Sequence, residues 1–218
     1  MQPLSISIDG PTASGKTTLG SALAAHLGAA FLDTGLTFRA LAYALAKDVV
    51  QPTDDWRSFI EHRPMSPPDP AGVTEHEAIL YDGRDITGDI WDASLDADLK
   101  KVAADERWRD EILRLHRDAV ADHPRIVVVG RDVALTLLPG DALWIYLTAS
   151  LPIRRERRRA QYATYPARSI AVGPETPRDQ ATRAAIKARP GALEIDSTGL
   201  PPDAVFSRVL RGLPGNRG

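Results

Sequence analysis

The stretch Gly10-Pro11-Thr12-Ala13-Ser14-Gly15-Lys16-Thr17 matches the phosphate-binding pattern G-x-x-x-x-G-K-[ST] at every fixed position. It follows an apolar run at residues 4–8, typical of a buried strand, and leads into a helical pattern over residues 16–27. Glycines in such a loop let backbone amides turn toward a phosphate, and the helix N-terminus adds positive potential. We therefore expect a nucleotide phosphate site, with Lys16 at the β and γ phosphates and the Thr17 hydroxyl on magnesium.

Apolar runs alternate with helical patterns along the rest of the chain. Strands are predicted at residues 30–32, 126–129, 143–147 and 193–196. Helices are predicted after Gly35, with Phe38, Leu41, Ala42 and Leu45 on one face, and at residues 96–121, 151–161 and 201–210. The helix at 96–121 is expected to kink near Asp105. This alternation predicts an α/β fold with a doubly wound parallel sheet of about five strands and helices on both faces.

Two regions interrupt the alternation. Residues 49–92 are rich in proline, with a weak strand at 78–81 and a turn at Asp82-Gly83, and indicate a small insertion. A polar, proline-dotted stretch follows residue 161 and runs to about Thr182. We expect one domain, residues 1–218, that carries the insertion.

The composition excludes several classes of protein. The 218 residues include no cysteine, which excludes disulfides and cysteine-ligated metals, and the net charge is only -2. No global field therefore favours nucleic acid or an anionic membrane. Met1-Gln2-Pro3 leads straight into the first apolar run, and no apolar run approaches the ~20 residues of a membrane span. We expect a cytoplasmic monomer without a signal peptide, whose partner is a nucleotide or a small phosphorylated acceptor.

Six segments together resemble the cytidylate kinase family of nucleoside monophosphate kinases. They occur in that family's order and span most of the chain: residues 8–17, 32–40 and 83–90, Val102-Ala103-Ala104 with Arg109, Gly130-Arg131-Asp132, and residues 196–200. The resemblance implies a kinase that uses ATP and Mg²⁺ to phosphorylate CMP, dCMP or a modified pyrimidine monophosphate. It also implies that residues 49–92 bind the acceptor and that residues 151–183 form an arginine-rich lid.

The resemblance assigns roles to individual residues. The residues expected to bind ATP, the phosphate donor, are Gly10, Ala13, Ser14, Gly15, Lys16, Thr17, Thr18 and Arg157. Acceptor binding falls to Asp33, Thr34, Arg39, Lys100, Arg109, Arg131, Asp132 and Arg183. The expected catalytic residues are Lys16, Arg131, Asp132, Arg154 and Arg158, and the expected magnesium residues are Thr17 and Asp33.

The predicted strands support part of this assignment independently. Asp33 and Arg131-Asp132 directly follow two predicted strands, and ligands of open α/β sheets bind at the carboxyl ends of strands. Arginine is suited to grip a phosphate with two parallel hydrogen bonds. We therefore expect these residues to share the site of the glycine loop.

Departures from the family pattern fall mainly in the acceptor half. Lys100 stands where the family has a small hydroxyl residue near the base, and Trp91 replaces an arginine. Gln180 stands near the family's ribose-binding aspartate, with Asp179 one residue away. These departures leave the identity of the acceptor open.

Two other interpretations remain. The first is a kinase for a non-nucleotide small molecule with an alcohol, phosphate or phosphonate acceptor group. For an alcohol, Asp33 would accept the hydroxyl proton. The other interpretation is a nucleotide-binding regulator without catalytic activity. A GTPase-like switch would read guanine through an N-K-x-D motif, which is absent because the sole asparagine is Asn216. A panel of acceptors would separate these interpretations.

Overall fold

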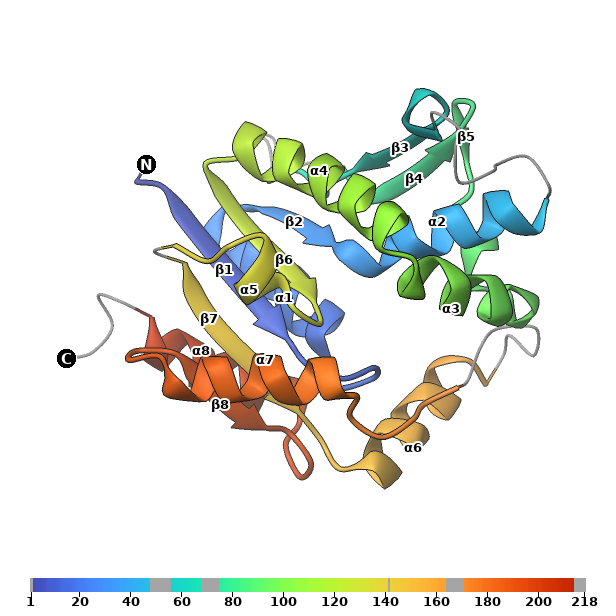
Figure 1. The fold of residues 1–218 in the computed structure, drawn as a ribbon. Helices are drawn as coiled ribbons and strands as arrows, with labels where there is room; N and C mark the ends of the chain where they lie inside the picture. Colours follow the sequence, from blue (N-terminus) through green and yellow to red (C-terminus); the bar gives the residue numbers. More distant parts are fainter. Residues whose placement is uncertain (1, 48–55, 68–74, 141, 164–170, 214–218) are drawn as a thin grey trace.

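A five-stranded parallel sheet forms the centre of the computed structural model, which describes residues 2–47, 56–67, 75–140, 142–163 and 171–213. The strand order is β2-β6-β1-β7-β8 (Figure 1). The strands are β1 (Leu4–Asp9), β2 (Ala30–Asp33), β6 (Arg125–Gly130), β7 (Leu143–Thr148) and β8 (Leu193–Asp196). The predicted parallel α/β sheet is confirmed.

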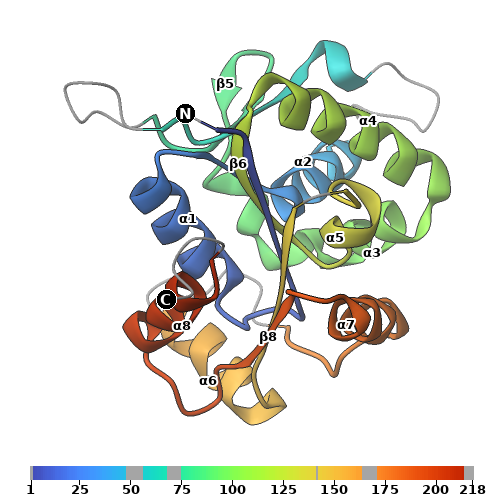
Figure 2. The same ribbon diagram turned by 90° about the vertical axis from the view of Figure 1, so that its left-hand side faces the viewer.

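Helices cover both faces of this sheet (Figure 2). On one face α1 (Lys16–Leu27) and α8 (Pro202–Gly212) share a core with Val127 and Val129. On the other, α5 (Val133–Thr136) and α7 (Pro177–Ala188) share a core with Ile126 and Val128. Successive residues of β6 thus enter opposite cores, which is why its sequence is an uninterrupted apolar run.

A smaller antiparallel sheet lies within the predicted insertion. It consists of β3 (Ile60–Arg63), β4 (Ala78–Tyr81) and β5 (Arg84–Asp85), accompanied by the 3-10 turns η1 (Trp56–Ser58), η2 (Asp89–Trp91) and η3 (Ala93–Leu95). The strand at 78–81 and the turn at Asp82-Gly83 were predicted, whereas β3 and β5 were not. This sheet shares a third core with α2 (Thr34–Ala46), through Leu41 and Ile79, and is thereby fixed beside the carboxyl end of β2.

The predicted kink near Asp105 separates two helices, α3 (Asp96–Ala104) and α4 (Glu106–Asp122). Asp105 is extended, with φ -82° and ψ 120°, and its carboxylate accepts a hydrogen bond from the backbone N–H of Arg107. It therefore acts as the N-cap of α4. The arginine-rich helix α6 (Leu151–Gln161) has the predicted bounds.

Two helices differ from prediction. Of the predicted face of α2, Leu41 and Ala42 are buried, and Phe38 and Leu45 are half-buried against the smaller core. Leu36, Thr37 and Ala40 are buried as well, because the main sheet and the smaller core enclose the helix on two sides. Helix α7 occupies part of the stretch expected to be irregular. Its start is encoded locally by a reciprocal cap between Thr176 and Asp179, with proline in the first turn. Across the described ranges, no helix has both the length and the apolar character needed to span a membrane.

Candidate active site

A cavity of about 960 Å³ opens at the carboxyl ends of the central strands. Its lining includes the loop at residues 12–18, Asp33 at the end of β2 with Thr34 after it, and Arg131 and Asp132 after β6. Strand β1 lies between β6 and β7, so the connection from β6 to β7 passes over β1 and a crevice forms beyond its end. Residues from α2, α3, α4, α6, α7 and α8 complete the walls.

The glycine loop has a backbone that few other residues permit. Gly10 has φ +148°, and a Cβ there would lie 2.0 Å from the carbonyl oxygen of Leu147. Gly15, which precedes α1, has φ +102°. The Ser14 hydroxyl is buried without a hydrogen-bond partner among the described residues. A loop opening onto a helix N-terminus, with an unused buried hydroxyl, fits the phosphates of a nucleotide.

Lys16 lies at the mouth of this loop, where its ammonium donates a hydrogen bond to the carbonyl of Pro11 at 2.8 Å. Burial lowers the pKa of Lys16 to about 8, and the charge of Asp33 opposes that shift. The ammonium is thus cationic at neutral pH and held by a single carbonyl, which leaves it available to phosphate oxygens.

Thr17 and Asp33 form the oxygen-rich side of the cavity. The Thr17 hydroxyl donates to Asp33 Oδ2 at 2.8 Å, while Asp33 Oδ1 accepts from the backbone N–H of Gly35. The Asp33 backbone N–H in turn donates to Glu77 Oε1 at 2.5 Å. A hydroxyl and a carboxylate are hard oxygen ligands that suit Mg²⁺, which binds few protein groups and keeps nucleotide phosphates and water as its other ligands. The predicted magnesium pair therefore fits the ion.

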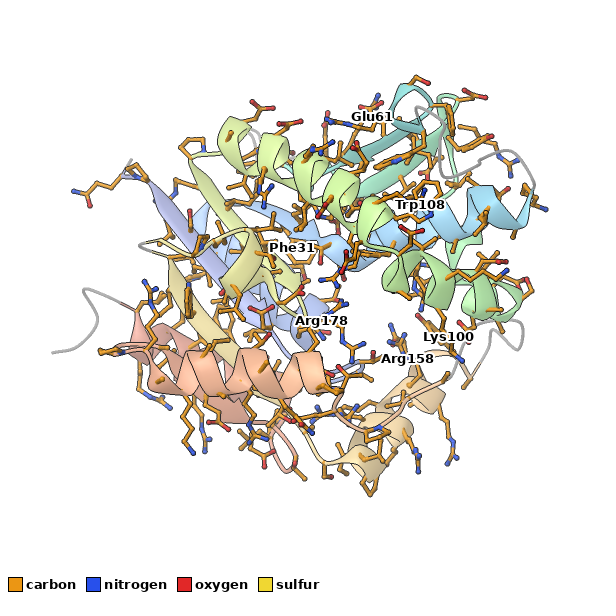
Figure 3. All side chains as sticks on the ribbon, in the orientation of Figure 1. Phe31, Glu61, Lys100, Trp108, Arg158 and Arg178 are labelled. Atoms are coloured by element: carbon orange, nitrogen blue, oxygen red, sulfur yellow. The ribbon has the colours of Figure 1, made fainter. Side chains whose placement is uncertain are left out.

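Arginines from four helices and from the loop after β6 converge on the cavity. The cavity lining includes Arg39 of α2, Arg109 of α4, Arg131 after β6, Arg157 and Arg158 of α6, and Arg178 of α7. In Figure 3 the side chains of Arg158 and Arg178 lie toward the middle of the molecule, between their own helices and α2–α4. Six guanidinium groups in one cavity give a strongly positive site that is suited to several phosphate groups at once.

Carboxylates hold three of these arginines in place. Arg131 donates from Nε to Asp179 Oδ1 at 2.8 Å and from Nη2 to Oδ2 at 2.5 Å, and Asp179 is fully buried. Asp132 lies 3.4 Å from Arg109 and 3.5 Å from Arg178. The two-point pairing fixes the plane of the Arg131 guanidinium before any ligand binds.

Asp9 anchors the loop that carries Arg131 and Asp132. Its two carboxylate oxygens accept hydrogen bonds from the backbone N–H groups of Val133 and Ala134 at 2.8 and 2.9 Å. Burial raises the pKa of Asp9 to about 7 despite these bonds. The sequence analysis gave Asp9 no role, although a carboxylate at the end of a buried strand is the available signal.

A buried polar network lies behind the cavity wall that His116 and Asp33 form. The Thr37 hydroxyl bonds to His62 Nδ1 at 2.7 Å and His116 Nε2 at 2.9 Å, and His62 Nε2 bonds to Glu77 Oε1 at 2.8 Å. Burial lowers the pKa of His62 to about 4 and that of His116 well below its ordinary value, so both rings are neutral at neutral pH. Since Glu77 also accepts a hydrogen bond from the Asp33 backbone N–H, the network joins the cavity wall at His116 to the last residue of β2. Its members are too far apart in sequence for any motif to reveal them.

The cavity brings together most of the residues that the sequence predicted. Those in its lining are Ala13, Ser14, Gly15, Lys16, Thr17, Thr18, Asp33, Thr34, Arg39, Arg109, Arg131, Asp132, Arg157 and Arg158. Thr34 is oriented by its hydroxyl, which donates to the Val129 carbonyl at 2.9 Å.

Four predicted residues of the described chain do not line the cavity: Gly10, Lys100, Arg154 and Arg183. Gly10 shapes the loop from behind. Lys100 is exposed on α3, because Leu99 and Ala103 occupy the face toward the cavity. Arg154 is 2% exposed and donates to the carbonyls of Ala149 and Thr12, so it braces the glycine loop from outside.

Arg183 is directed away from the cavity by its ion pairs. It donates to Glu194 Oε1 from Nε at 2.7 Å and lies 3.5 Å from Glu175. Arg178, five residues earlier on α7, lines the cavity instead, although the sequence analysis did not select it. The two candidates for a ribose-binding residue are also outside the lining, since Asp179 is buried against Arg131 and Gln180 is exposed.

Comparisons with known proteins agree with this geometry. A family model described as cytidylate kinase matches residues 6–214. A cytidylate kinase of Herpetosiphon aurantiacus is 34% identical over 216 residues, covering 95% of this chain and 93% of the relative. A cytidylate kinase of Cutibacterium acnes is 32% identical, with coverage of 97% and 96%. The solved structure of TT1252 from Thermus thermophilus shares the fold, with a TM-score of 0.50, 18% identity and coverage of 99% and 100%.

Proposed function

Since this chain belongs to the cytidylate kinase family of nucleoside monophosphate kinases, we propose that it uses ATP and Mg²⁺ to convert CMP or dCMP to the diphosphate. The observation that supports this most directly is one cavity that holds both a nucleotide phosphate loop and a separate group of arginines. A phosphotransferase needs both, because donor and acceptor phosphates must meet in line without water between them.

The reaction requires little proton chemistry from the protein. A phosphate monoester has a second pKa near ~6, so the acceptor is already a dianion at neutral pH and attacks without a general base. The protein must then position two anions and neutralise the charge on the transferring group. Bound magnesium would supply part of that neutralisation, held through Thr17 and Asp33.

We assign the donor to the loop and the acceptor to the opposite wall. Lys16 would bind the β and γ phosphates, with the backbone N–H groups of residues 12–18 around them. Arg39 and Arg131 would bind the acceptor phosphate, and Arg158 would approach the transferring group from α6. Residues 49–92 would enclose the acceptor, and residues 151–183 would close over both nucleotides.

Asp132 and Arg109 are the candidates for reading the base. Cytosine presents an amino group that donates beside ring atoms that accept, and a carboxylate and a guanidinium match that edge. Their side chains lie 3.4 Å apart in the cavity lining. Uracil, which has a carbonyl in place of the amino group, would face the carboxylate unfavourably.

An alcohol acceptor is the alternative. The carboxylate of Asp33, whose oxygens accept hydrogen bonds from Thr17 and Gly35, would then have to accept the hydroxyl proton as well. The deciding experiment measures ADP release with CMP, dCMP, UMP, AMP and a 5-substituted CMP at saturating ATP. We expect kcat/KM for CMP or dCMP to exceed that for UMP by at least tenfold. Release of ADP that no nucleoside monophosphate stimulates would refute the proposal.

A further inference from the structure

Trp91, at the end of η2, is the departure from the family pattern that the proposed mechanism leaves unused. All four tryptophans lie in the described ranges, and of these Trp91 alone lines the cavity. Trp56, Trp108 and Trp144 are each less than 8% exposed within hydrophobic cores. Trp91 is half-buried: it packs against the core that α2 shares with the smaller sheet, and it also lines the cavity.

Trp91 contacts one of the two arginines assigned to the acceptor phosphate. The guanidinium carbon of Arg39 lies 4.5 Å from the centroid of the Trp91 ring, within the range of a cation–π interaction. Nη1 of Arg39 also donates to the carbonyl of Ile90, the residue before Trp91. The end of η2 thus contacts the Arg39 guanidinium group both on its planar face, through the Trp91 ring, and at one edge, through the Ile90 carbonyl.

A second aromatic ring extends this arrangement to helix α6. Tyr162, the C-cap of α6, is 5% exposed, and its ring centroid lies 6.2 Å from that of Trp91. The Arg158 guanidinium carbon lies 5.0 Å from the Tyr162 ring centroid, and Arg158 Nη1 donates to the Tyr162 hydroxyl at 2.7 Å. Arg39, Trp91, Tyr162 and Arg158 together form what we call the arginine–aromatic stack.

The stack brings two like charges, those of Arg39 and Arg158, near enough to interact. Burial lowers the pKa of Arg39, and the nearby charge of Arg158 lowers it further, whereas Tyr162 raises it. Nε of Arg158 is buried and has no hydrogen-bond partner among the described residues. Two neighbouring guanidinium groups, one of them with a buried N–H that has no partner among the described residues, favour the binding of an anion that can accept hydrogen bonds from both.

We propose that Trp91 and Tyr162 are positioning residues that preform a clamp, made of Arg39 and Arg158, for the phosphate of the acceptor. Arg39 belongs to α2 and Arg158 to α6, and the two rings connect these side chains. Preforming the clamp removes the ordering cost that two free arginine side chains would incur on binding. This inference rests on the proposed function, since the acceptor is taken to carry a phosphate.

The kinetic test compares variants that remove a ring with variants that keep one. Trp91→Leu and Tyr162→Leu should each raise the KM of CMP about tenfold, the usual scale of one partly desolvated cation–π contact. The KM of ATP should stay within twofold. Trp91→Phe should restore the KM of CMP to within about threefold of wild type, because phenylalanine keeps the ring face. Trp144→Phe, which alters a tryptophan in a hydrophobic core, is the control and should leave both constants unchanged.

Tryptophan fluorescence supplies a readout that a purely structural role would not change. CMP should alter the fluorescence of wild type and of Trp144→Phe, and Trp91→Phe should lose that response. In Tyr162→Leu the response should remain but require about tenfold more CMP. In a titration with inorganic phosphate, Tyr162→Leu should likewise require about tenfold more phosphate than wild type for the same fluorescence change.

The outcomes separate this inference from the proposed function. If wild type phosphorylates CMP but Trp91→Leu and Tyr162→Leu keep its KM within twofold, the stack does not position the clamp. If these variants raise the KM of ATP and of CMP equally, the proposed clamp is also wrong, because such a result would indicate a general distortion of the cavity. If wild type does not use CMP, the proposed function fails. The fluorescence titration with inorganic phosphate then tests the clamp by itself. If its midpoint is the same in Tyr162→Leu as in wild type, the proposed clamp is wrong.

Discussion

Replacing Arg178 by alanine should impair use of the acceptor, whereas Arg183→Ala on the same helix should not. Arg178 lines the cavity, with Nε 3.5 Å from Asp132, and a third of its side chain is exposed. Arg183 is similarly exposed, but its Nε donates to Glu194 at 2.7 Å on the outer side of α7. The two variants therefore remove the same chemical group from two places that differ in access to the cavity.

The structure sets the expected size of each effect. A hydrogen bond to a charged group contributes about 1.5–3 kcal/mol, or roughly ten- to 150-fold in kcat/KM. Partial exposure of Arg178 favours the lower end, so we expect a loss of about ten- to thirtyfold for CMP. An exposed ion pair contributes about 0–1 kcal/mol to stability, so Arg183→Ala should lower the melting temperature slightly and leave the kinetics within twofold.

The assay is a set of initial rates with CMP varied at saturating ATP and with ATP varied at saturating CMP. The KM of ATP should change little in either variant, because Arg178 enters from α7 beside Asp132 rather than from the glycine loop. Thermal unfolding of both variants controls for loss of fold. A loss of activity in Arg183→Ala that equals or exceeds the loss in Arg178→Ala would refute the placement of these arginines.

Three further predictions concern charge and buried polar groups. Because burial lowers the pKa of Lys16 to about 8, its charge is present below that pH and lost above it. ATP affinity by calorimetry should therefore fall as pH rises through about 8, and a Lys16→Met variant should bind weakly with no such step; a wild-type profile flat from pH 6 to 9 would contradict this. Asp179→Asn should lower the free energy of unfolding in urea by about 1.5–3 kcal/mol, because Arg131, whose side chain is 39% exposed, loses two charge-assisted hydrogen bonds; a loss below about 0.5 kcal/mol would contradict it. Thr37→Val should cost about 1–3 kcal/mol by the same measurement, since the rings of His62 and His116 each lose a partner, and an unchanged midpoint would show that the network adds no stability.

The sequence alone was sufficient for the features encoded by neighbouring residues. The strand, glycine loop and helix at residues 4–27 have their predicted order, and the loop's backbone angles at Gly10 and Gly15 explain why glycine stands there. The five parallel strands and the break at Asp105 were predicted for the same reason. Local hydrophobic pattern and capping chemistry determine such elements before distant contacts form.

A strong local signal was overlooked in one place. Thr176-Pro177-Arg178-Asp179 carries the cap residues and the first-turn proline of a helix, yet the stretch was expected to be irregular. The error extended to the site, because the start of α7 determines which of its arginines reaches the cavity. Recognising that cap would have given the helix, although not the direction of Arg178.

Only the tertiary structure decided which charged residues meet in the cavity. Successive residues of a helix point about 100° apart, so the packing of α3 turns Leu99 inward and leaves Lys100 exposed. The arginine at 154 braces the loop because α6 packs against it, while Arg158, one turn later, faces the cavity. The Thr37 network and the arginine–aromatic stack join side chains separated by dozens of residues. The sequence does not specify where a charged side chain points. Its orientation is fixed when a helix buries one of its faces and when a carboxylate from another element forms an ion pair with the side chain.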